Sequence, residues 1–245
     1  MRLLYGILRY LSLIASTNLL QDETSQGIYA TLKGHTDVVN AVLWVAAREK
    51  GNEIIVSGAV DKTVRIWKEK NGQVQTTAQR TVVNEKFEPG QVLKEHSGSI
   101  HCLAVLPELL ATGSSDGSLN IYTFNSTANE YSLSQTIRTS PVYPLTLSLH
   151  STKDGTLLAI GGSSPHVHLF ASPLDTLNFT KIASLKGHED WIRGLDFTSH
   201  NSDTYLASAS QDRYIRLWKI TQSTTYTSTN DIDALYSLSY SSLTN

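Results

Sequence analysis

LASASQDRYIRLW (residues 206–218) is the stretch of sequence that decides the fold, because two further versions of it lie earlier in the chain. These are IVSGAVDKTVRIW (residues 55–67) and LATGSSDGSLNIY (residues 110–122). In each version a small hydroxyl residue stands four places before an aspartate, and an aromatic residue stands six places after it. Self-similarity at a period of about 40 to 50 residues is the signature of a repeat architecture. The repeat is therefore the unit from which we predict the fold.

A second shared element precedes each version and contains a histidine. It reads LKGHTDVVNAVLWV (residues 32–45), LKEHSGSIHCLAVL (residues 93–106) and LKGHEDWIRGLDFT (residues 185–198). The distance from the histidine to the following aspartate varies, which we attribute to the turn between two strands, where insertions are best tolerated. Since His96 and His188 lie about two repeat lengths apart, a degenerate repeat is expected between them.

The degenerate repeat occupies that interval. SPVYPLTLSL (residues 140–149) reads as its first strand, and LLAIGGSSPHVHLF (residues 157–170) reads as the next two. Ser164 stands where the aspartate is expected, and Phe170 stands where the tryptophan is expected. Because this repeat lacks the shared polar residues, we expect it to be held more loosely than the other three.

The local pattern inside the repeats is that of β-strands. In residues 63–67 and 214–218, alternate side chains point to opposite faces, and β-branched and aromatic residues dominate. The Asp-Lys, Asp-Gly and Asp-Arg steps indicate tight turns between neighbouring strands. No amphipathic helix of about ten or more residues is predicted after residue 25. The sequence thus predicts an all-β propeller.

The Gly-His, hydroxyl, aspartate and tryptophan positions resemble those of the WD40 family, whose blades are four-stranded sheets. Blades are expected at about residues 26–68, 91–124, 135–171 and 181–220. The resemblance implies a hydrogen-bonded structural relay in each complete blade. The expected relays are His35, Ser57, Asp61 and Trp67; His96, Thr112, Asp116 and Tyr122; and His188, Ser208, Asp212 and Trp218. Tyr122 can donate only through a hydroxyl placed differently from the indole N–H.

Histidine, serine and aspartate recurring together also raise the possibility of a hydrolase. A nucleophilic triad needs one exposed serine beside a base in a cleft, together with oxyanion donors. Here the set recurs three times and ends in an aromatic donor each time, which is expected of buried polar groups that satisfy one another. We therefore interpret the set as structural and predict no catalytic residue.

Composition limits the partners that the chain could bind. The formal net charge is −2 and the apolar fraction is 40%, so there is none of the basic excess that binding to a phosphate backbone requires. The single cysteine, Cys102, lies in an apolar stretch, which excludes an internal disulfide and suits a reducing compartment. We expect it to be a small core residue.

The histidines outside the relays give no indication of a metal or cofactor site. They are His101, His150, His166, His168 and His200, and none has metal-ligand spacing to carboxylates or cysteines. His166 and His168 share a strand face, but two ligands are too few for a site. No metal, cofactor or small-molecule substrate is expected.

Three stretches are similar to the Elongator complex subunit 2 family. They are GIYATLKGH (residues 27–35), VYPLTLSL followed by LLAIGG (residues 142–149 and 157–162), and GHEDWIRGLDF followed by LASASQDRYIRLWKI (residues 187–197 and 206–220). The resemblance implies two tandem seven-bladed propellers in the complete protein. It also implies a non-catalytic scaffold that joins Elongator subunits 1 and 3 and so supports modification of the tRNA wobble uridine. The expected location is the cytoplasm, with the nucleus as a second compartment; direct contact with tRNA is left open, and no membrane association is expected.

Parts of the chain depart from that family. Residues 1–25 match no full blade, residues 69–91 read as a polar surface connection, and residues 221–245 form a Ser/Thr/Tyr-rich tail that would lead to a missing blade. Four blades do not close a seven-bladed ring, and terminal blades expose apolar faces. We therefore expect an incomplete ring from an N-terminal fragment.

A contact surface for partners is expected in the last repeat. Its residues are Asp190, Trp191, Arg193, Gln211 and Arg213. Tryptophan beside arginine is typical of interface anchors, although Trp191 would also suit packing between blades. The alternative function is another WD40 adaptor, such as a ubiquitin-ligase substrate receptor, because the fold alone does not name a role.

Overall fold

A computed structural model describes residues 31–45, 53–69, 87–201, 203–222 and 236–240 of the chain, the last stretch by its backbone alone. The segment expected to match no blade, residues 1–25, lies outside these ranges. So do most of the tail and residues 70–86 of the polar connection. The rest of that expected connection was assigned wrongly, since residue 69 ends one strand and residues 87–91 are part of the next.

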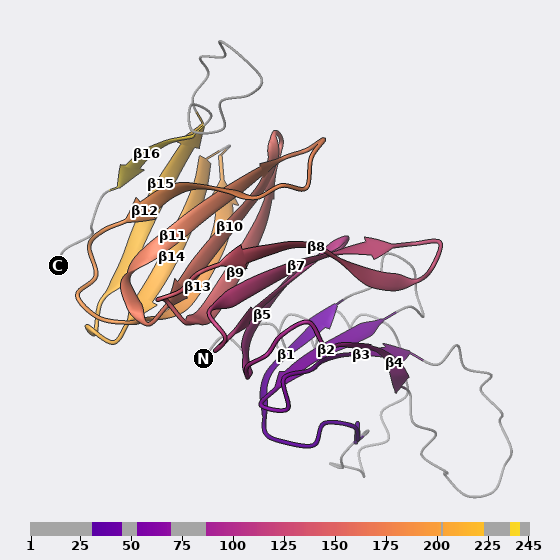
Figure 1. Cartoon of the computed structure of the whole chain (residues 1–245). Coiled ribbons are helices and arrows are strands. Elements are labelled where there is room, and N and C mark those ends of the chain that lie inside the picture. The colour runs from indigo at the N-terminus through magenta and orange to yellow at the C-terminus, as the bar shows by residue number, and fades with distance from the viewer. Residues whose placement is uncertain (1–30, 46–52, 70–86, 202, 223–235, 241–245) are drawn as a thin grey trace, which may run out of the picture. The chain divides into compact units, whose positions relative to one another are not determined.

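Four four-stranded antiparallel sheets follow one another in chain order (Figure 1). Sheet one comprises β1 (Val39–Val45), β2 (Ile54–Ala59), β3 (Val64–Glu69) and β4 (Phe87–Leu93). Sheet two comprises β5 (Ile100–Leu106), β6 (Leu109–Ser114), β7 (Ser118–Asn125) and β8 (Glu130–Arg138). Sheet three comprises β9 (Pro144–Thr152), β10 (Gly155–Gly162), β11 (Ser164–Pro173) and β12 (Thr180–Leu185). Sheet four comprises β13 (Ile192–His200), β14 (Asp203–Ser210), β15 (Ile215–Gln222) and β16 (Tyr236–Tyr240).

The described residues contain strands and turns and no helix, and the four sheets are those of an incomplete WD40 β-propeller. The expected all-β fold class is thus confirmed. Within those residues, no helix is long and apolar enough to cross a membrane.

Sheets and sequence repeats are offset from each other by one strand. The fourth strand of sheets one and three comes from the segment that leads into the next histidine element, as β4 does immediately before Lys94, and β8 leads into the degenerate repeat in the same way. Each repeat therefore contributes to two sheets, and part of the predicted tail, residues 236–240, pairs with β15. The antiparallel ladders between third and fourth strands join neighbouring repeats.

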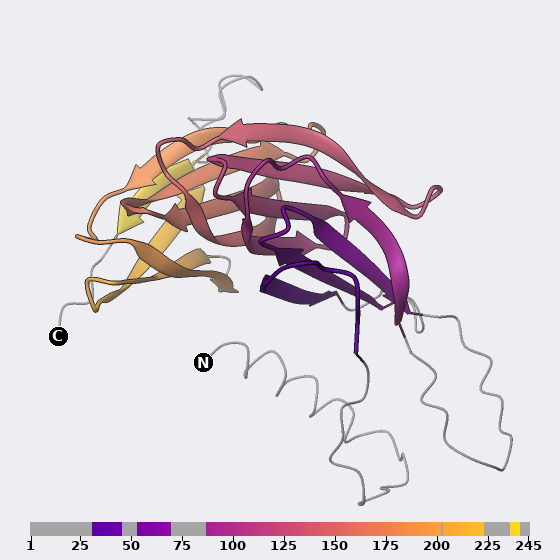
Figure 2. The same cartoon turned by 60° about the horizontal axis from the view of Figure 1, so that its bottom comes forward.

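The hydrophobic cores lie between the sheets. The core between sheets one and two contains Ile66 and Ile100, that between sheets two and three contains Ile121 and Leu158, and that between sheets three and four contains Leu169 and Leu206. Strands alternate their side chains between two faces, so each inner sheet contributes to the core on both sides. Figure 2 shows the same stacking from a second direction.

Glycine allows the sheets to approach closely at one repeated position. A Cβ added to Gly58 would lie 2.5 Å from Ile100 of the next sheet, and one added to Gly161 would lie 2.5 Å from Ile192. Gly113 occupies the same place against Pro144, at 2.7 Å. The missing side chain lets the first strand of the following sheet pack directly on the backbone.

Candidate functional site

The first polar network ties the loop before β1 to the interior of sheet one. His35 Nδ1 lies 2.8 Å from Asp61 Oδ2, and its Nε2 lies 2.8 Å from Ser57 Oγ. Trp67 Nε1 donates to the same Ser57 Oγ at 2.9 Å. A single arrangement of protons satisfies every bond: the indole donates to the serine, the serine donates to His35 Nε2, and Nδ1–H donates to the carboxylate.

Sheet four repeats this geometry. His188 Nδ1 lies 2.7 Å from Asp212 Oδ2, and His188 Nε2 lies 2.8 Å from Ser208 Oγ. Trp218 Nε1 donates to Ser208 Oγ at 2.8 Å. The structure thus brings together all four residues of the relay predicted for this repeat.

Sheet two keeps the histidine bonds and changes the aromatic end. His96 lies 3.1 Å from Asp116 Oδ2 through Nδ1 and 2.8 Å from Thr112 Oγ1 through Nε2. Tyr122 Oη donates to Glu95 Oε2 at 3.0 Å. Glu95 takes the place of Gly34 and Gly187, since the sequence reads KEH here and KGH elsewhere.

A steric relation explains this exchange of glycine for glutamate. A Cβ on Gly34 would lie 2.9 Å from Trp67 Cη2, and one on Gly187 would lie 3.1 Å from Trp218 Cη2. The indole therefore fills the space that a side chain before the histidine would need. Tyrosine is smaller, and its hydroxyl gives the glutamate a hydrogen-bond donor.

Sheet three has no such network, in agreement with the missing residues of its sequence. Ile160 replaces the hydroxyl residue and is fully buried. Ser163 Oγ accepts from Tyr143 N at 2.9 Å, and Ser163 N donates to Tyr143 O at 3.1 Å. The other three sheets make the same backbone bond, as Ser115 N does to Ser99 O, so only the side-chain part of the bracing is lost.

The aspartates also hold the tight turn that follows them. Asp61 Oδ1 accepts from Thr63 N at 3.0 Å and from Thr63 Oγ1 at 2.7 Å, and Asp61 Oδ2 accepts from Thr36 N. Ser118 donates to Asp116 Oδ1 in the same two ways. Sequence reasoning missed Thr63 and Ser118. The available signal was the place two residues after an aspartate, where an Asx-turn puts a backbone N–H that the carboxylate accepts; Thr63 and Ser118 add a hydroxyl donor there.

These hydrogen bonds fix the charge of the aspartates. Burial raises the pKa of Asp212, but donors from Tyr214, His188 and Glu189 outweigh it and lower the pKa to about 2. Burial likewise opposes ionisation of Asp61, and the bonds from Thr63, Thr36 and His35 bring its pKa well below the ordinary value. Each carboxylate is therefore ionised at neutral pH.

The connectivity of serine, histidine and aspartate matches that of a hydrolase triad, but its surroundings do not. Ser57, Thr112 and Ser208 are each at most 5% exposed. Two of these oxygens already accept a hydrogen bond from an indole. A substrate carbonyl has no path to a nucleophile held in this way, so the arrangement suits bracing of the fold.

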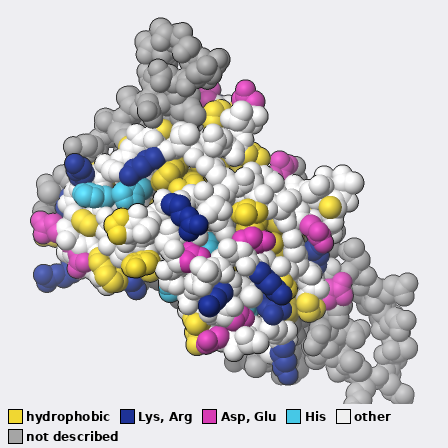
Figure 3. Space-filling model, viewed as in Figure 1, with side chains coloured by type: hydrophobic (Ala, Val, Ile, Leu, Met, Phe, Trp, Pro, Cys, Tyr) yellow, Lys and Arg dark blue, Asp and Glu magenta, His cyan; other side chains and the backbone are white. Residues whose placement is uncertain are grey.

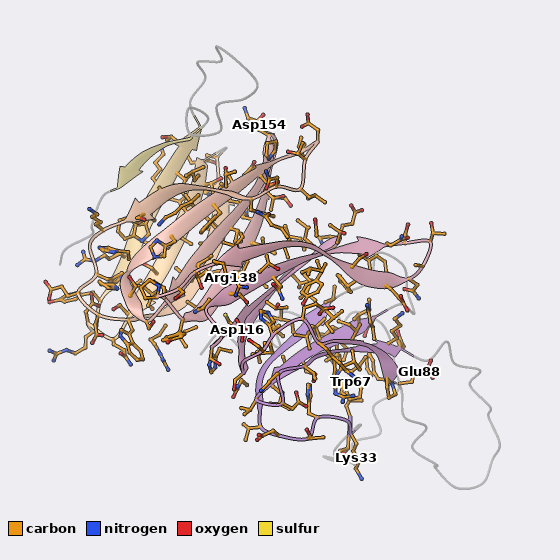
Figure 4. All side chains as sticks on the ribbon, viewed as in Figure 1. Lys33, Trp67, Glu88, Asp116, Arg138 and Asp154 are labelled. Atoms are coloured by element: carbon orange, nitrogen blue, oxygen red, sulfur yellow. The ribbon has the colours of Figure 1, made fainter. Side chains whose placement is uncertain are left out.

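Four of the five residues predicted as a partner surface lie on two joined turns of sheet four, and Arg193 is the second residue of β13. Gln211 N donates to Trp191 O at 3.0 Å, and Ser210 Oγ donates to Asp190 O at 2.9 Å. All five residues are exposed, and Trp191 keeps 44% of its surface accessible. The indole therefore lies on the surface rather than between sheets. Figure 4 shows that Asp116, in the corresponding turn of sheet two, lies at the opposite end of the strands from Asp154.

Arg213 has a left-handed backbone conformation, with φ of 74°. Lys62 and Gly117 occupy the same place in the turns of sheets one and two, with φ of 68° and 72°. The turn requires this conformation, which glycine adopts without steric cost and other residues adopt at some cost. Arg213 therefore places an exposed positive charge at a turn whose backbone conformation is strained for a residue with a side chain.

Among the described residues, no group of three or more histidine, cysteine, aspartate or glutamate side chains is arranged to hold a metal ion. His168 Nδ1 bonds Ser184 Oγ at 3.1 Å, and burial together with Lys181 and His166 lowers the pKa of His168 to about 4. Figure 3 shows acidic and basic side chains intermixed on the viewed face, without a field of one sign.

Comparison with known proteins agrees with this geometry. The family model described as WD domain, G-beta repeat matches residues 27–68, 87–123 and 179–219. The family model does not match the part of the chain between residues 123 and 179. That part contains β9, β10 and β11, which belong to the sheet that lacks the polar network.

Similar proteins from several organisms share one name. Elongator complex protein 2 of Saccharomyces cerevisiae is 34% identical over 207 residues, which cover 81% of this chain and 24% of that protein. The proteins of the same name from Dictyostelium discoideum and Homo sapiens are 33% and 28% identical, covering 84% and 87% of the chain. The chain spans about a quarter of the length of these relatives. It therefore belongs to the WD40-repeat proteins and, among them, to the homologues of Elongator complex protein 2.

Proposed function

We propose that the chain is a non-catalytic scaffold subunit of Elongator that supports modification of the tRNA wobble uridine through protein contacts. The observation that carries the non-catalytic role is the internal use of the three hydroxyl groups of Ser57, Thr112 and Ser208. Similarity to Elongator complex protein 2 supports the assignment to that complex. The chemistry is then performed by another subunit, and the chain acts in the cytoplasm and also in the nucleus.

The proposed partners are Elongator subunits 1 and 3, and the proposed contact surface is the pair of joined turns in sheet four. Trp191 offers an exposed indole beside Arg193 and Arg213, which is the composition of an interface anchor with cationic neighbours. The turn is held rigidly, because Asp212 binds Glu189 N on one side and Tyr214 N on the other. A rigid exposed aromatic residue loses little conformational freedom when a partner binds.

Affinity purification of the tagged chain tests this function. We expect subunits 1 and 3 to co-purify, and we expect Trp191→Ala to reduce their recovery at least about tenfold, the effect of about 1.4 kcal/mol. Tyr143→Ala is the matched control, since Tyr143 is an exposed aromatic residue at the corresponding place in sheet three. Recovery of neither subunit, or equal loss with both variants, would contradict the proposal.

A ubiquitin-ligase substrate receptor is the alternative, and the same purification distinguishes it. Recovery of ligase subunits in place of Elongator subunits would support that function. An activity-based hydrolase probe that labelled Ser57 or Ser208 would overturn the non-catalytic role, since both hydroxyls are buried in the structure.

A further inference from the structure

Two glutamines make the same pair of hydrogen bonds to the main chain of the sheet that follows their own. Gln91 of β4 donates through Nε2 to Tyr131 O at 2.7 Å, and its Oε1 accepts from Tyr131 N at 2.8 Å. Gln135 of β8 does the same with Phe179, at 2.9 Å and 2.8 Å. One side-chain amide thus bonds both polar backbone groups of a single residue in the next sheet.

The two residues held in this way lie at the free edges of their sheets. Tyr131 is the second residue of β8, the last strand of sheet two, and Phe179 directly precedes β12, the last strand of sheet three. Backbone groups that point outward from such an edge have no neighbouring strand to bond. The amide of glutamine carries a carbonyl and N–H donors, so it makes the two bonds that a peptide group of a neighbouring strand would make.

The side chains of the same two residues are buried between sheets. Tyr131 is 4% exposed and belongs to the core between sheets one and two, where its ring centroid lies 5.1 Å from that of Phe124. Phe179 is 3% exposed and belongs to the core between sheets two and three. Each residue is therefore joined to the preceding sheet twice, by apolar packing of its ring and by the glutamine on its backbone.

The glutamines occupy equivalent positions, and sheet three has an alanine there. Sheets one and two read FEPGQ (residues 87–91) and YSLSQ (residues 131–135), with glutamine four places after the aromatic residue, whereas sheet three reads FTKIA (residues 179–183). The next residue of each strand pairs with the same place in the third strand: Val92 with Arg65, Thr136 with Asn120 and Ser184 with His168. Ala183 has no amide, so it makes no such bonds to sheet four.

The glutamine bonds lie at the end of the strands opposite to the relays. β7 runs from the turn that contains Asp116 to the turn at residues 126–129, and Tyr131 follows the second of these turns. Sheet two is thus tied at one end by its relay and at the other end by Gln91. Sheet three has no relay, so it depends more on the bonds from Gln135.

We propose that Gln91 and Gln135 are clamps that hold the beginning of the next sheet's outer strand and prevent that strand from opening at its free end. The end of an edge strand is bonded on one side only, and local opening starts at such places. Each clamp adds two hydrogen bonds on the open side. The clamps therefore determine which outer strands can open from their first residue, a property of the fold that does not rest on the proposed function.

Native-state hydrogen exchange of Gln91→Ala and Gln135→Ala tests the proposal, and each variant is the control for the other. In Gln91→Ala the backbone amide of Tyr131 should exchange at least about tenfold faster than in the native chain, whereas that of Phe179 should change less than about twofold. In Gln135→Ala the pattern should be reversed. Circular dichroism verifies that each variant is folded.

Replacement by methionine separates hydrogen bonding from packing. Methionine is unbranched like glutamine and keeps its apolar contacts, but it has no N–H donor and only a weak acceptor. Gln91→Met and Gln135→Met should therefore accelerate exchange of the same backbone amides as the alanine variants do. Unchanged exchange of the clamped amide, protection retained by methionine, or equal acceleration of both amides in a single variant would each overturn the proposal.

Discussion

At the scale of single residues, stability rests on buried carboxylates that accept several hydrogen bonds each. Asp212 accepts from His188, Glu189 N and Tyr214 N, and its side chain is 5% exposed. Substitution of Asp212 by alanine leaves these donors unpaired, so we expect the free energy of unfolding to fall by about 1–3 kcal/mol. Urea denaturation measures this loss, and Asp190→Ala, at an exposed position in the adjoining turn, is the control.

The same carboxylate predicts a dependence of stability on pH. Its pKa is about 2 in the folded chain, and an unfolded aspartate has a pKa of about 3.9. Because the folded value is the lower one, the contribution is fully present above about pH 4 and is lost as pH falls through about 2. The difference in stability between the native chain and Asp212→Asn should therefore shrink over this interval. A difference that stays constant down to pH 2 would contradict the prediction.

Glycine and tryptophan should behave as a coupled pair. Gly187→Ala places a Cβ about 3.1 Å from Trp218, and we expect a loss of about 1–3 kcal/mol from the overpacking. Adding Trp218→Tyr should restore part of that loss, since sheet two combines a side chain at this position with Tyr122. A double-mutant cycle by chemical denaturation measures the coupling, and purely additive effects would disprove it.

At the scale of strands and turns, the sheet without a polar network offers a test by hydrogen exchange. Ser163 N and Gln211 N donate to the equivalent carbonyl in sheets three and four. Only Gln211 lies beside an aspartate that bonds a histidine. We expect the amide of Ser163 to exchange at least about tenfold faster in native-state measurements, because local opening there breaks fewer bonds. Equal protection of the two amides would contradict this prediction. It would show that hydrophobic packing of sheet three is sufficient to hold its turn.

The left-handed turn position gives a prediction of the opposite sign. Arg213→Gly removes the steric cost of φ near 74° and should stabilise sheet four by up to about 1 kcal/mol. Gly117→Ala should do the reverse in sheet two, where the new Cβ would also lie 3.2 Å from Ser140. Thermal unfolding of both variants measures the two shifts, and shifts of the same sign would contradict this account.

At the scale of the whole molecule, much of the architecture could be predicted from the sequence, because the residues that determine the sheets recur in each repeat. The polar residues that recur with His35, His96 and His188 predicted the blades, and the alternation of side chains predicted the strands. The offset between sheets and repeats was not predicted. A fourth strand such as β4 has little pattern of its own, reading FEPGQVL, and is fixed by pairing with β3. The role of Glu95 was missed for a similar reason, since it depends on contact with a residue far along the chain.

Packing between sheets should dominate the overall stability. Gly161→Ala would bring a Cβ within 2.5 Å of Ile192, so we expect a loss of about 1–3 kcal/mol. Ile192→Ala in the same chain removes Cγ2, the nearest atom, so the loss in the double variant should be smaller than the sum of the two single losses. Calorimetric unfolding of the single and double variants measures these losses. A loss in the double variant equal to that sum would contradict this account.

The strand offset makes this chain divisible in an unusual way. A cut in the exposed turn between β7 and β8, residues 126–129, would leave two polypeptides that share one sheet. The first piece would end with β7, which stays paired with β6 but loses its partner along the other edge, and the second would begin with β8, the strand that completes the sheet. Reunion of the pieces would then restore the β7–β8 ladder together with the core between sheets two and three, as in a split reporter whose halves assemble by strand complementation.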